Sequence, residues 1–272
     1  MTKFPNLLQR VLVSAIAIPL ILLIVYLGKI YFAIFVLAII FLTLYEFYNL
    51  AESKNISPDY IPGFVYAFLV MLIFYTEQQD YFLPLTFLFI TVVSIMNLTR
   101  LENNAFTNIG TTIFGSLFLS LFYSTLIGIR EKFETDYSHG AYVIMVMLAA
   151  IWICDSAAYF GGTAFGKHRL HERISPKKSI EGAVFGFIFS LLTFIVGKFL
   201  FLDFLNWFDI IYMGLVVGVI GQIGDLVESM FKRDAGVKDS SNILPGHGGI
   251  LDRFDSLLFV SPFIYFYLNY AY

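Results

Sequence analysis

Charged residues are scarce in this chain of 272 amino acids. Only 14% are Asp, Glu, Lys or Arg, against about 25% in a typical soluble domain. Hydrophobic residues make up 58% of the chain, and the mean hydropathy is +0.79. This composition excludes disordered, collagen-like and coiled-coil proteins as well as basic nucleic-acid-binding domains. It places the chain in a lipid bilayer.

Cysteine is almost absent. The single Cys154 excludes an intrachain disulfide framework and a zinc site built from cysteines. An internal repeat, a low-complexity tract and a soluble domain are also lacking. We therefore expect one integral membrane domain over residues 1–272, with mainly apolar spans in 1–140 and the chemistry in 141–272.

Nine stretches without Lys, Arg, Asp or Glu predict an all-α bundle of about nine membrane helices. They are residues 11–28, 30–45, 60–76, 81–99, 105–129, 141–154, 182–197, 210–224 and 256–272. Several are shorter than the about 20 residues that a span needs. We expect polar residues to extend them, as residues 155–161 would extend the sixth.

The distribution of Lys and Arg predicts the orientation of these spans. With a cytoplasmic N-terminus, thirteen Lys and Arg lie on the cytoplasmic side and four on the other side. The two longest polar connections, about 162–179 and about 228–251, then lie in the cytoplasm. The first apolar stretch is interpreted as an uncleaved span and not as a signal peptide, because more spans follow it.

Carboxylates gather at the ends of the predicted spans in the second half of the chain. They are Asp155, Glu181, Asp225, Glu228, Asp252 and Asp255. A carboxylate near hydrocarbon is costly unless it is paired or bound to a metal. Any one of them could be an interfacial residue paired with Lys or Arg, but six together indicate a functional site. Glu46, at the end of the second span, has no such company and is interpreted as structural.

The eighth predicted helix carries one polar face if it continues past residue 224. Asp225, Glu228, Ser229 and Lys232 then follow the i, i+3, i+4, i+7 spacing that places side chains on one face. That face presents two anions, a hydroxyl and a cation at the membrane surface.

A polar connection leads from this helix into the last one, which we expect to begin near Asp252. Gly248 and Gly249 permit positive φ, so backbone N–H groups can point together at an anion. Asp252 and Asp255 fall one turn apart. Taken alone, they would be ordinary helix-capping residues.

Together these residues supply what phosphoryl chemistry on a nucleotide needs. Hard oxygen ligands such as Asp225 and Asp252 suit Mg²⁺, which binds through one or two carboxylates and substrate phosphates. The remaining phosphate charge would be neutralised by Lys232, Arg233, Lys238 and Arg253. A phosphate monoester that attacks another phosphate is already anionic, so positioning and charge neutralisation are sufficient.

A second basic loop, residues 161–169, nearly matches a P-loop. His168 stands where that motif needs Ser or Thr, and the loop follows a membrane helix, so we reject the P-loop fold. The cations from Lys167 to Lys178 indicate either recognition of phosphate on a lipid or nucleotide, or an anchor on anionic lipid. His139 is expected in a loop on the opposite side.

The stretch from Ser229 to Asp255 resembles the signature of the phosphatidate cytidylyltransferases. The matching positions are Ser229, Lys232, Arg233, Lys238, Asp239, Pro245, Gly246, His247, Gly248, Gly249, Asp252, Arg253 and Asp255. Residues 155–167 and 175–182 resemble other characteristic stretches of that family. The resemblance covers about the last 120 residues; the first 140 match only as generic spans.

This resemblance implies transfer of CMP from CTP to phosphatidate, giving CDP-diacylglycerol and pyrophosphate, with Mg²⁺ as cofactor. It implies Asp225 and Asp252 as metal ligands, with Glu228 and Asp255 beside them. Lys232 and Lys238 join the two aspartates as catalytic residues.

The resemblance also suggests residues that bind substrate. They are Lys167, Lys177, Lys178, Arg233, Asp239, His247, Gly248, Gly249 and Arg253. Asp155, Glu181 and Ser229 are expected to support them. The expected partners are CTP, phosphatidic acid and membrane lipids, with no nucleic acid, and a homodimer is one alternative for the oligomeric state.

Two other functions stay open at this point. A CTP-dependent lipid kinase would use a similar scaffold but transfer the γ-phosphate. A secondary transporter would also place carboxylates in the membrane, but commonly near its midplane and between inverted repeats. We expect a multi-pass protein of the cell membrane with its active site on the cytoplasmic side.

Overall fold

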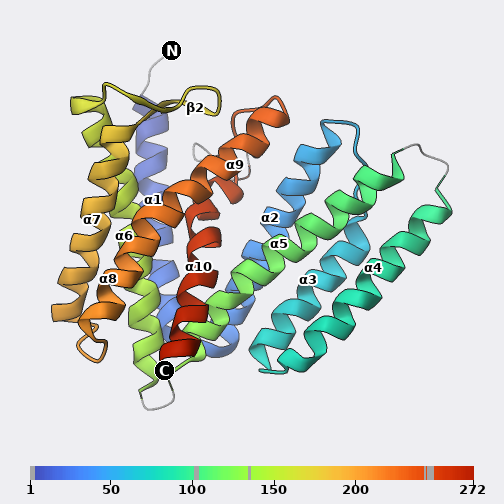
Figure 1. Ribbon diagram of the computed structural model, residues 1–272, viewed down its shortest axis with the longest axis horizontal. Coiled ribbons are helices and arrows are strands. Elements are labelled where there is room, and N and C mark those ends of the chain that lie inside the picture. The colour runs from blue at the N-terminus through green and yellow to red at the C-terminus, as the bar shows by residue number, and fades with distance from the viewer. Residues whose placement is uncertain (1–3, 101–103, 134–135, 242, 244–247) are drawn as a thin grey trace.

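The computed structural model describes residues 4–100, 104–133, 136–241, 243 and 248–272. Within these residues the chain forms nine helical rods and one short β-hairpin (Figure 1). The rods are α1 (Phe4–Leu27), α2 (Lys29–Glu52), α3 (Tyr60–Tyr75), a 3₁₀ turn η1 (Gln79–Tyr81) leading into α4 (Phe82–Leu98), α5 (Ala105–Glu131), α6 (Tyr137–Phe165), α7 (Ile180–Leu200), α8 (Trp207–Val216) continuing through a π-helical turn η2 (Val217–Gly221) into α9 (Gln222–Asp234), and α10 (Leu251–Ala271).

The rods confirm the predicted class, an all-helical membrane protein. Each of the nine predicted stretches falls on one rod, and α6 continues past Asp155 as expected. In the part of the chain that the structure describes, six helical segments are long and apolar enough to cross a membrane. These are Lys29–Glu52, Gln79–Leu98, Ala105–Glu131, Tyr137–Phe165, Ile180–Leu200 and Trp207–Asp234.

The hairpin between α6 and α7 was not expected. Its strands β1 (Arg169–His171) and β2 (Ser175–Ser179) pair antiparallel, with Arg169 opposite Ser179 and His171 opposite Ser175. In Figure 1 the hairpin lies across one end of the bundle, beside α9. Residues 161–165 of the second basic loop belong to α6, and the cations that follow it lie on a hairpin next to the polar face of α9.

Close contact between α9 and α10 depends on a glycine. A Cβ atom at Gly224 would lie 2.8 Å from the ring of Phe259 and 3.0 Å from the carbonyl oxygen of Asp255. Because glycine has no side chain, the two helices approach closely at this point. This approach allows carboxylates from both helices to share one site.

His139 lies in the first turn of α6, so the expectation of a loop was wrong. Its ring stacks on Phe204 with 3.6 Å between the ring centroids. Asp136 caps this helix by accepting a hydrogen bond from the backbone N–H of Ser138. The cap and the stacked rings indicate that His139 has a structural role at the start of α6.

Candidate active site

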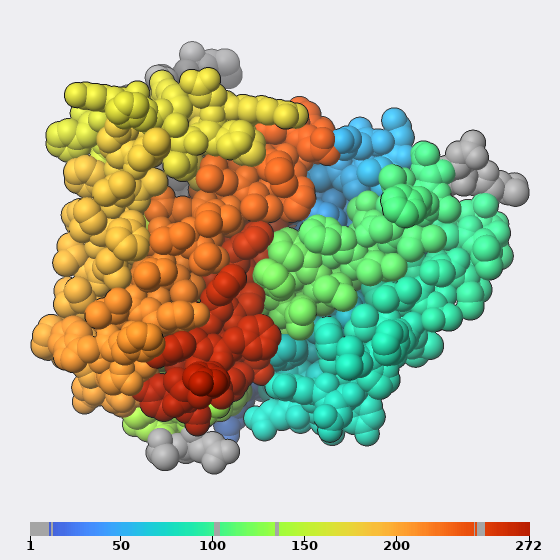
Figure 2. Space-filling model, viewed as in Figure 1, coloured from blue at the N-terminus to red at the C-terminus, as the bar shows by residue number. Residues whose placement is uncertain are grey.

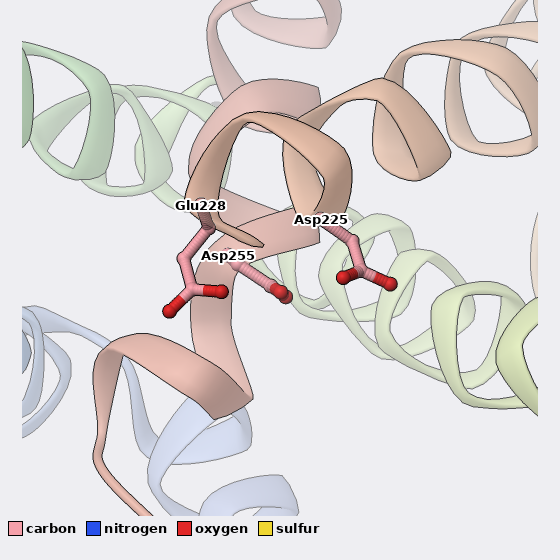
Figure 3. A group of neighbouring side chains, drawn as sticks. All are labelled: Asp225, Glu228 and Asp255. Carbon is pink, nitrogen blue, oxygen red and sulfur yellow. The ribbon is translucent and has the colours of Figure 1, made fainter. Parts of the chain in front are cut away.

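Three carboxylates from the last two rods converge on one point. Asp225 and Glu228 come from α9 and Asp255 comes from α10, as Figure 3 shows. One oxygen of each lies within 4.8 Å of an oxygen of the other two. Glu228 and Asp255 are buried and Asp225 is partly exposed. We call these three residues the carboxylate cluster.

The polar face of α9 has the arrangement that its spacing predicted. Lys232 Nζ lies 2.6 Å from Glu228 Oε2, one turn away on the helix. Ser229 Oγ lies 3.5 Å from Asp225 Oδ1. The continuous helix from α8 through η2 into α9 therefore carries two of the three acidic residues of the cluster, Asp225 and Glu228, and the lysine beside them.

Two lysines from different elements reach these carboxylates. Lys232 pairs with Asp252 as well as with Glu228, and its side chain is only 10% exposed. Lys178, from β2 of the hairpin, pairs with Asp225. The hairpin thus brings a cation to the cluster.

Asp252 lies beside the cluster but faces the connection between α9 and α10. Its Oδ2 accepts hydrogen bonds from the backbone N–H of Ser240 at 2.9 Å, from the Ser240 hydroxyl at 2.9 Å and from the backbone N–H of Gly249 at 2.8 Å. The structure therefore places Asp255 in the group of three acidic residues that fits one cation, and places Asp252 one turn away, bridged to it by Lys232.

Glycine is required at positions 248 and 249, at the end of this connection, for two different physical reasons. Gly248 has φ +82°, the left-handed conformation that its position predicted. Gly249 lacks positive φ, but a Cβ there would collide with the Ser240 hydroxyl and lie 2.6 Å from Glu46 Oε1. His247 lies outside the described residues.

Glu181 lies away from the carboxylate cluster and holds the start of the hairpin. It accepts hydrogen bonds from the backbone N–H groups of Lys167 at 3.0 Å and His168 at 3.2 Å, and it pairs with His168 Nδ1 at 2.7 Å. Glu181 therefore stabilises the basic loop at Lys167 and His168. Asp155, on α6, is exposed and lies within electrostatic range of Asp225 and Lys178.

The other expected substrate-binding residues lie at the exposed rim. They are Lys167, Lys177, Arg233, Lys238, Asp239 and Arg253. Arg233 also donates a hydrogen bond to the carbonyl oxygen of Val237 at 2.7 Å, which holds the end of α9. Five of these six exposed residues are Lys or Arg.

Sequence reasoning missed the role of Glu46. This side chain is fully buried and accepts hydrogen bonds from the hydroxyls of Ser240 and Ser241 and from the backbone N–H groups of Ile250 and Leu251. One signal was present, because a lone carboxylate in an otherwise uncharged stretch of a span needs partners. The partners themselves come from the far end of the chain.

The carboxylate cluster suits a divalent cation. Its ligands are all carboxylate oxygens, the hard donors that Mg²⁺ and Ca²⁺ prefer. Among the described residues, the buried Glu228 Oε1 has no hydrogen-bond partner. The two lysines carry two positive charges and contact three carboxylates, Asp225, Glu228 and Asp252. Asp255 is a fourth acidic residue in the same place. A divalent ion would pair the free oxygen and reduce the repulsion among these carboxylates.

An apolar groove runs from this site along the face of the bundle. It has a volume of about 290 Å³ and lies where α7 and the α8–α9 rod run side by side, on the face that Figure 2 shows. Its lining residues are Leu170, Ile180, Ala183, Val184, Phe187, Gly218, Val219, Gln222, Ile223 and Leu226. Leu226 and Ile180 are close in sequence to the paired Asp225 and Lys178, so the groove begins beside the charged site.

Comparison with known proteins identifies the family of this chain. The model of the cytidylyltransferase family matches residues 8–271. A phosphatidate cytidylyltransferase of Bacillus subtilis is 34% identical over 267 residues, covering 96% of this chain and 97% of the relative. Relatives of the same name from Staphylococcus haemolyticus and Synechocystis are 36% and 31% identical, covering 94% and 96% of this chain and 96% of each relative. The chain belongs to the cytidylyltransferase family.

Proposed function

We infer that the chain transfers CMP from CTP to phosphatidate, giving CDP-diacylglycerol and pyrophosphate for phospholipid synthesis. One observation carries this inference: a cluster of three carboxylates and two lysines lies at the head of an apolar groove. A dissolved triphosphate and a membrane lipid can meet at such a place. Family membership over nearly the whole chain supports the same reaction.

We propose that Asp225, Glu228 and Asp255 hold Mg²⁺. The bound ion would neutralise charge on the substrate phosphates and fix their orientation. Asp252, which the sequence also suggested as a ligand, would hold Lys232 toward Glu228 and keep the connection before α10 in place.

In the reaction, an oxygen of the phosphatidate phosphate attacks the α-phosphorus of CTP. A new P–O bond forms and the bond between the α-phosphorus and the oxygen bridging to the β-phosphate breaks, so pyrophosphate leaves. The attacking oxygen is already anionic and needs no general base. We assign Lys178 and Lys232 to charge neutralisation at the reacting phosphates, and Lys167, Lys177, Lys238 and Arg253 to the outer phosphates.

The proposed topology has nine spans, with the N-terminus and the active site on the cytoplasmic side of the cell membrane. The excess of Lys and Arg on that side supports it. CTP is dissolved in the cytoplasm, and phosphatidate would enter from the adjoining leaflet. A homodimer remains one alternative for the oligomeric state.

Isotope placement tests the reaction. With Mg²⁺ and phosphatidate, the purified protein is expected to form labelled lipid from CTP that carries the label in its α-phosphate, and to form none from γ-labelled CTP. Label transferred to lipid only from the γ-phosphate would identify a CTP-dependent lipid kinase instead. Liberated pyrophosphate, measured in the same samples, should equal the labelled lipid.

We propose that the groove accepts an acyl chain of phosphatidate. Val184 lines the groove and is 50% exposed, so Val184→Trp is expected to fill the groove without disturbing the core. The KM for phosphatidate should rise about tenfold. Each buried CH₂ of the acyl chain contributes about 0.8 kcal/mol, so the loss of contacts to two CH₂ groups is enough for a tenfold change. The KM for CTP should stay unchanged.

Val196→Trp is the matched control for this variant. Val196 lies on the same helix and is 54% exposed, but it does not line the groove. Its substitution should leave both KM values unchanged. Equal effects of the two substitutions would exclude the groove as the acyl site.

A further inference from the structure

Glu46 is a buried carboxylate in the half of the chain that carries none of the carboxylate cluster. It lies in α2, and its side chain has no exposed surface. A buried ionised group is stable only where hydrogen bonds or opposite charges compensate for the lost water. Among the described residues, four donors reach it, and they come from the connection between α9 and α10 or from the first residue of α10.

Through these hydrogen bonds, Glu46 contacts both ends of that connection. At its beginning, the hydroxyls of Ser240 and Ser241 lie 3.0 and 2.5 Å from the Glu46 oxygens. At its end, the backbone N–H groups of Ile250 and Leu251 lie 2.8 and 2.7 Å away. One carboxylate therefore fixes two points of the chain that are ten residues apart.

Glu46 also caps α10 from another helix. The first N–H groups of a helix have no partner within it, and a nearby side chain usually accepts their hydrogen bonds. Ile250, the residue before α10, makes no such side-chain cap. The Glu46 carboxylate takes this place, and its negative charge interacts favourably with the N-terminal end of the helix dipole.

The contacts continue from Glu46 to the carboxylate cluster. The Ser240 hydroxyl lies within hydrogen-bond distance of Glu46 at 3.0 Å and of Asp252 at 2.9 Å. Asp252 pairs with Lys232, and Lys232 pairs with Glu228 of the cluster. The first turns of α10 carry both Asp252 and Asp255, so a shift of this end of the helix would move two site residues together.

The helix that carries Glu46 is itself fastened to α9. Phe47, the residue after Glu46, packs edge to face on Phe231 of α9, with 5.6 Å between the ring centroids. The Ser53 hydroxyl, which lies 2.7 Å from the carbonyl oxygen of Leu50, also lies 3.3 Å from the carbonyl oxygen of Ala235. Glu46 is thus a fixed point relative to the helix that carries Asp225 and Glu228.

We propose that Glu46 is a positioning residue for the cytidylyl transfer, a role that rests on the proposed function. It holds the start of α10 so that Asp255 meets Asp225 and Glu228, and it holds Ser240 so that Asp252 keeps Lys232 in place. It touches neither substrate. The apolar first half of the chain therefore takes part in the geometry of the active site.

Glu46→Gln tests the proposal. Glutamine keeps the size of the side chain but presents an NH₂ group to a site formed only by donors among the described residues. We expect kcat to fall about 10- to 100-fold, the range typical when a residue that orients a metal site is removed. Amide hydrogen exchange in a peptide covering Ile250 and Leu251 should become faster. This second measurement does not depend on the reaction.

Asp209→Asn is the matched control. Asp209 is also a fully buried carboxylate, and it accepts hydrogen bonds from the backbone N–H of Asn206 at 2.7 Å and from the hydroxyl of Tyr267 at 2.6 Å. It lies at the start of α8, at the opposite end of the rod from Asp225. Its substitution should lower thermal stability while kcat per folded molecule stays within about twofold of wild type and exchange at 250–251 stays slow.

The outcomes separate positioning from general stability. Loss of kcat together with faster exchange, in Glu46→Gln alone, supports the proposal. Normal kcat per folded molecule in that variant, or an equal loss in Asp209→Asn, overturns it.

If Glu46→Gln does not fold, a second variant keeps the proposal testable. Ser241→Ala removes a single donor and should lower kcat about threefold, the effect of one hydrogen bond. An unchanged kcat in Ser241→Ala then overturns the proposal. Failure of wild type to label lipid would refute the reaction itself, while the exchange measurement would still report the cap.

Discussion

Replacing Asp225 by Asn is expected to lower turnover by about 10³-fold or more. Asparagine keeps the volume of the side chain but removes the charge that would bind the metal ion and that pairs with Lys178. A metal ion that stabilises charge in the transition state contributes several kcal/mol, and each 1.36 kcal/mol corresponds to about tenfold in rate. The fold should persist, because Asp225 is partly exposed and its neighbours on α9 remain.

Asp234→Asn is the control for this substitution. Asp234 ends the same helix and pairs with Lys54, but both side chains are largely exposed. Its loss should leave turnover within about twofold, since exposed ion pairs contribute little. Both variants would be assayed in detergent with α-labelled CTP and phosphatidate, and binding of Mn²⁺ would be followed by electron paramagnetic resonance. Near-normal turnover of Asp225→Asn would refute its role as a ligand.

The same assay distinguishes the two aspartates of α10. Asp255→Asn is expected to abolish both turnover and Mn²⁺ binding, since Asp255 belongs to the carboxylate cluster. Asp252→Asn should also abolish turnover, but through the loss of its contacts with Lys232 and Ser240. Retained Mn²⁺ binding in Asp252→Asn alone would support this division. Loss of binding in Asp252→Asn and not in Asp255→Asn would reverse it.

Local spacing was enough to predict the polar face of α9. Asp225, Glu228 and Lys232 repeat at intervals that bring side chains together on any helix, so their proximity needed no tertiary information. The start of the last helix was also predicted, because a polar segment rich in glycine precedes a long apolar stretch. These features depend only on residues a few positions apart in the chain.

Spacing could not decide between Asp252 and Asp255. Residues three apart on a helix differ by about 60° around its axis, so both point toward the same region but not at the same atoms. Their directions are set by the packing of α10 on α9, which depends on Gly224 against Phe259. The helical pattern alone contains no information about this rotation.

Glu46 shows a second limit of prediction from the sequence. Its partners lie 194 to 205 residues away, and no local periodicity connects α2 with the end of the chain. Gly249 illustrates the same point, because the nearby Glu46 and Ser240 side chains, and not the backbone conformation, require glycine there. A buried carboxylate needs hydrogen-bond donors or cations as partners. A contact between distant helices can be predicted from one sequence only by searching the chain for such partners.

Lys232→Met is expected to destabilise the protein by about 3–5 kcal/mol and to abolish turnover. Lys232 is the shared cation of Glu228 and Asp252, whose side chains are 3% and 7% exposed. Removing one partner of a buried ion pair leaves an uncompensated charge, and here two carboxylates would lose the same ammonium group. Methionine fills similar volume, so the loss of charge, and not a cavity, would be measured.

Lys54→Met provides the comparison, because Lys54 also pairs with an aspartate but is 40% exposed. Its loss should change the free energy of unfolding by less than about 1 kcal/mol. Unfolding in mixed detergent micelles, followed by circular dichroism, gives both values. If Lys232→Met were as stable as Lys54→Met, Glu228 and Asp252 would have to be neutral in the wild-type protein, and a neutral Glu228 would not serve as an anionic ligand of a divalent cation. The stability of this one variant therefore tests the charge state on which the proposed metal site depends.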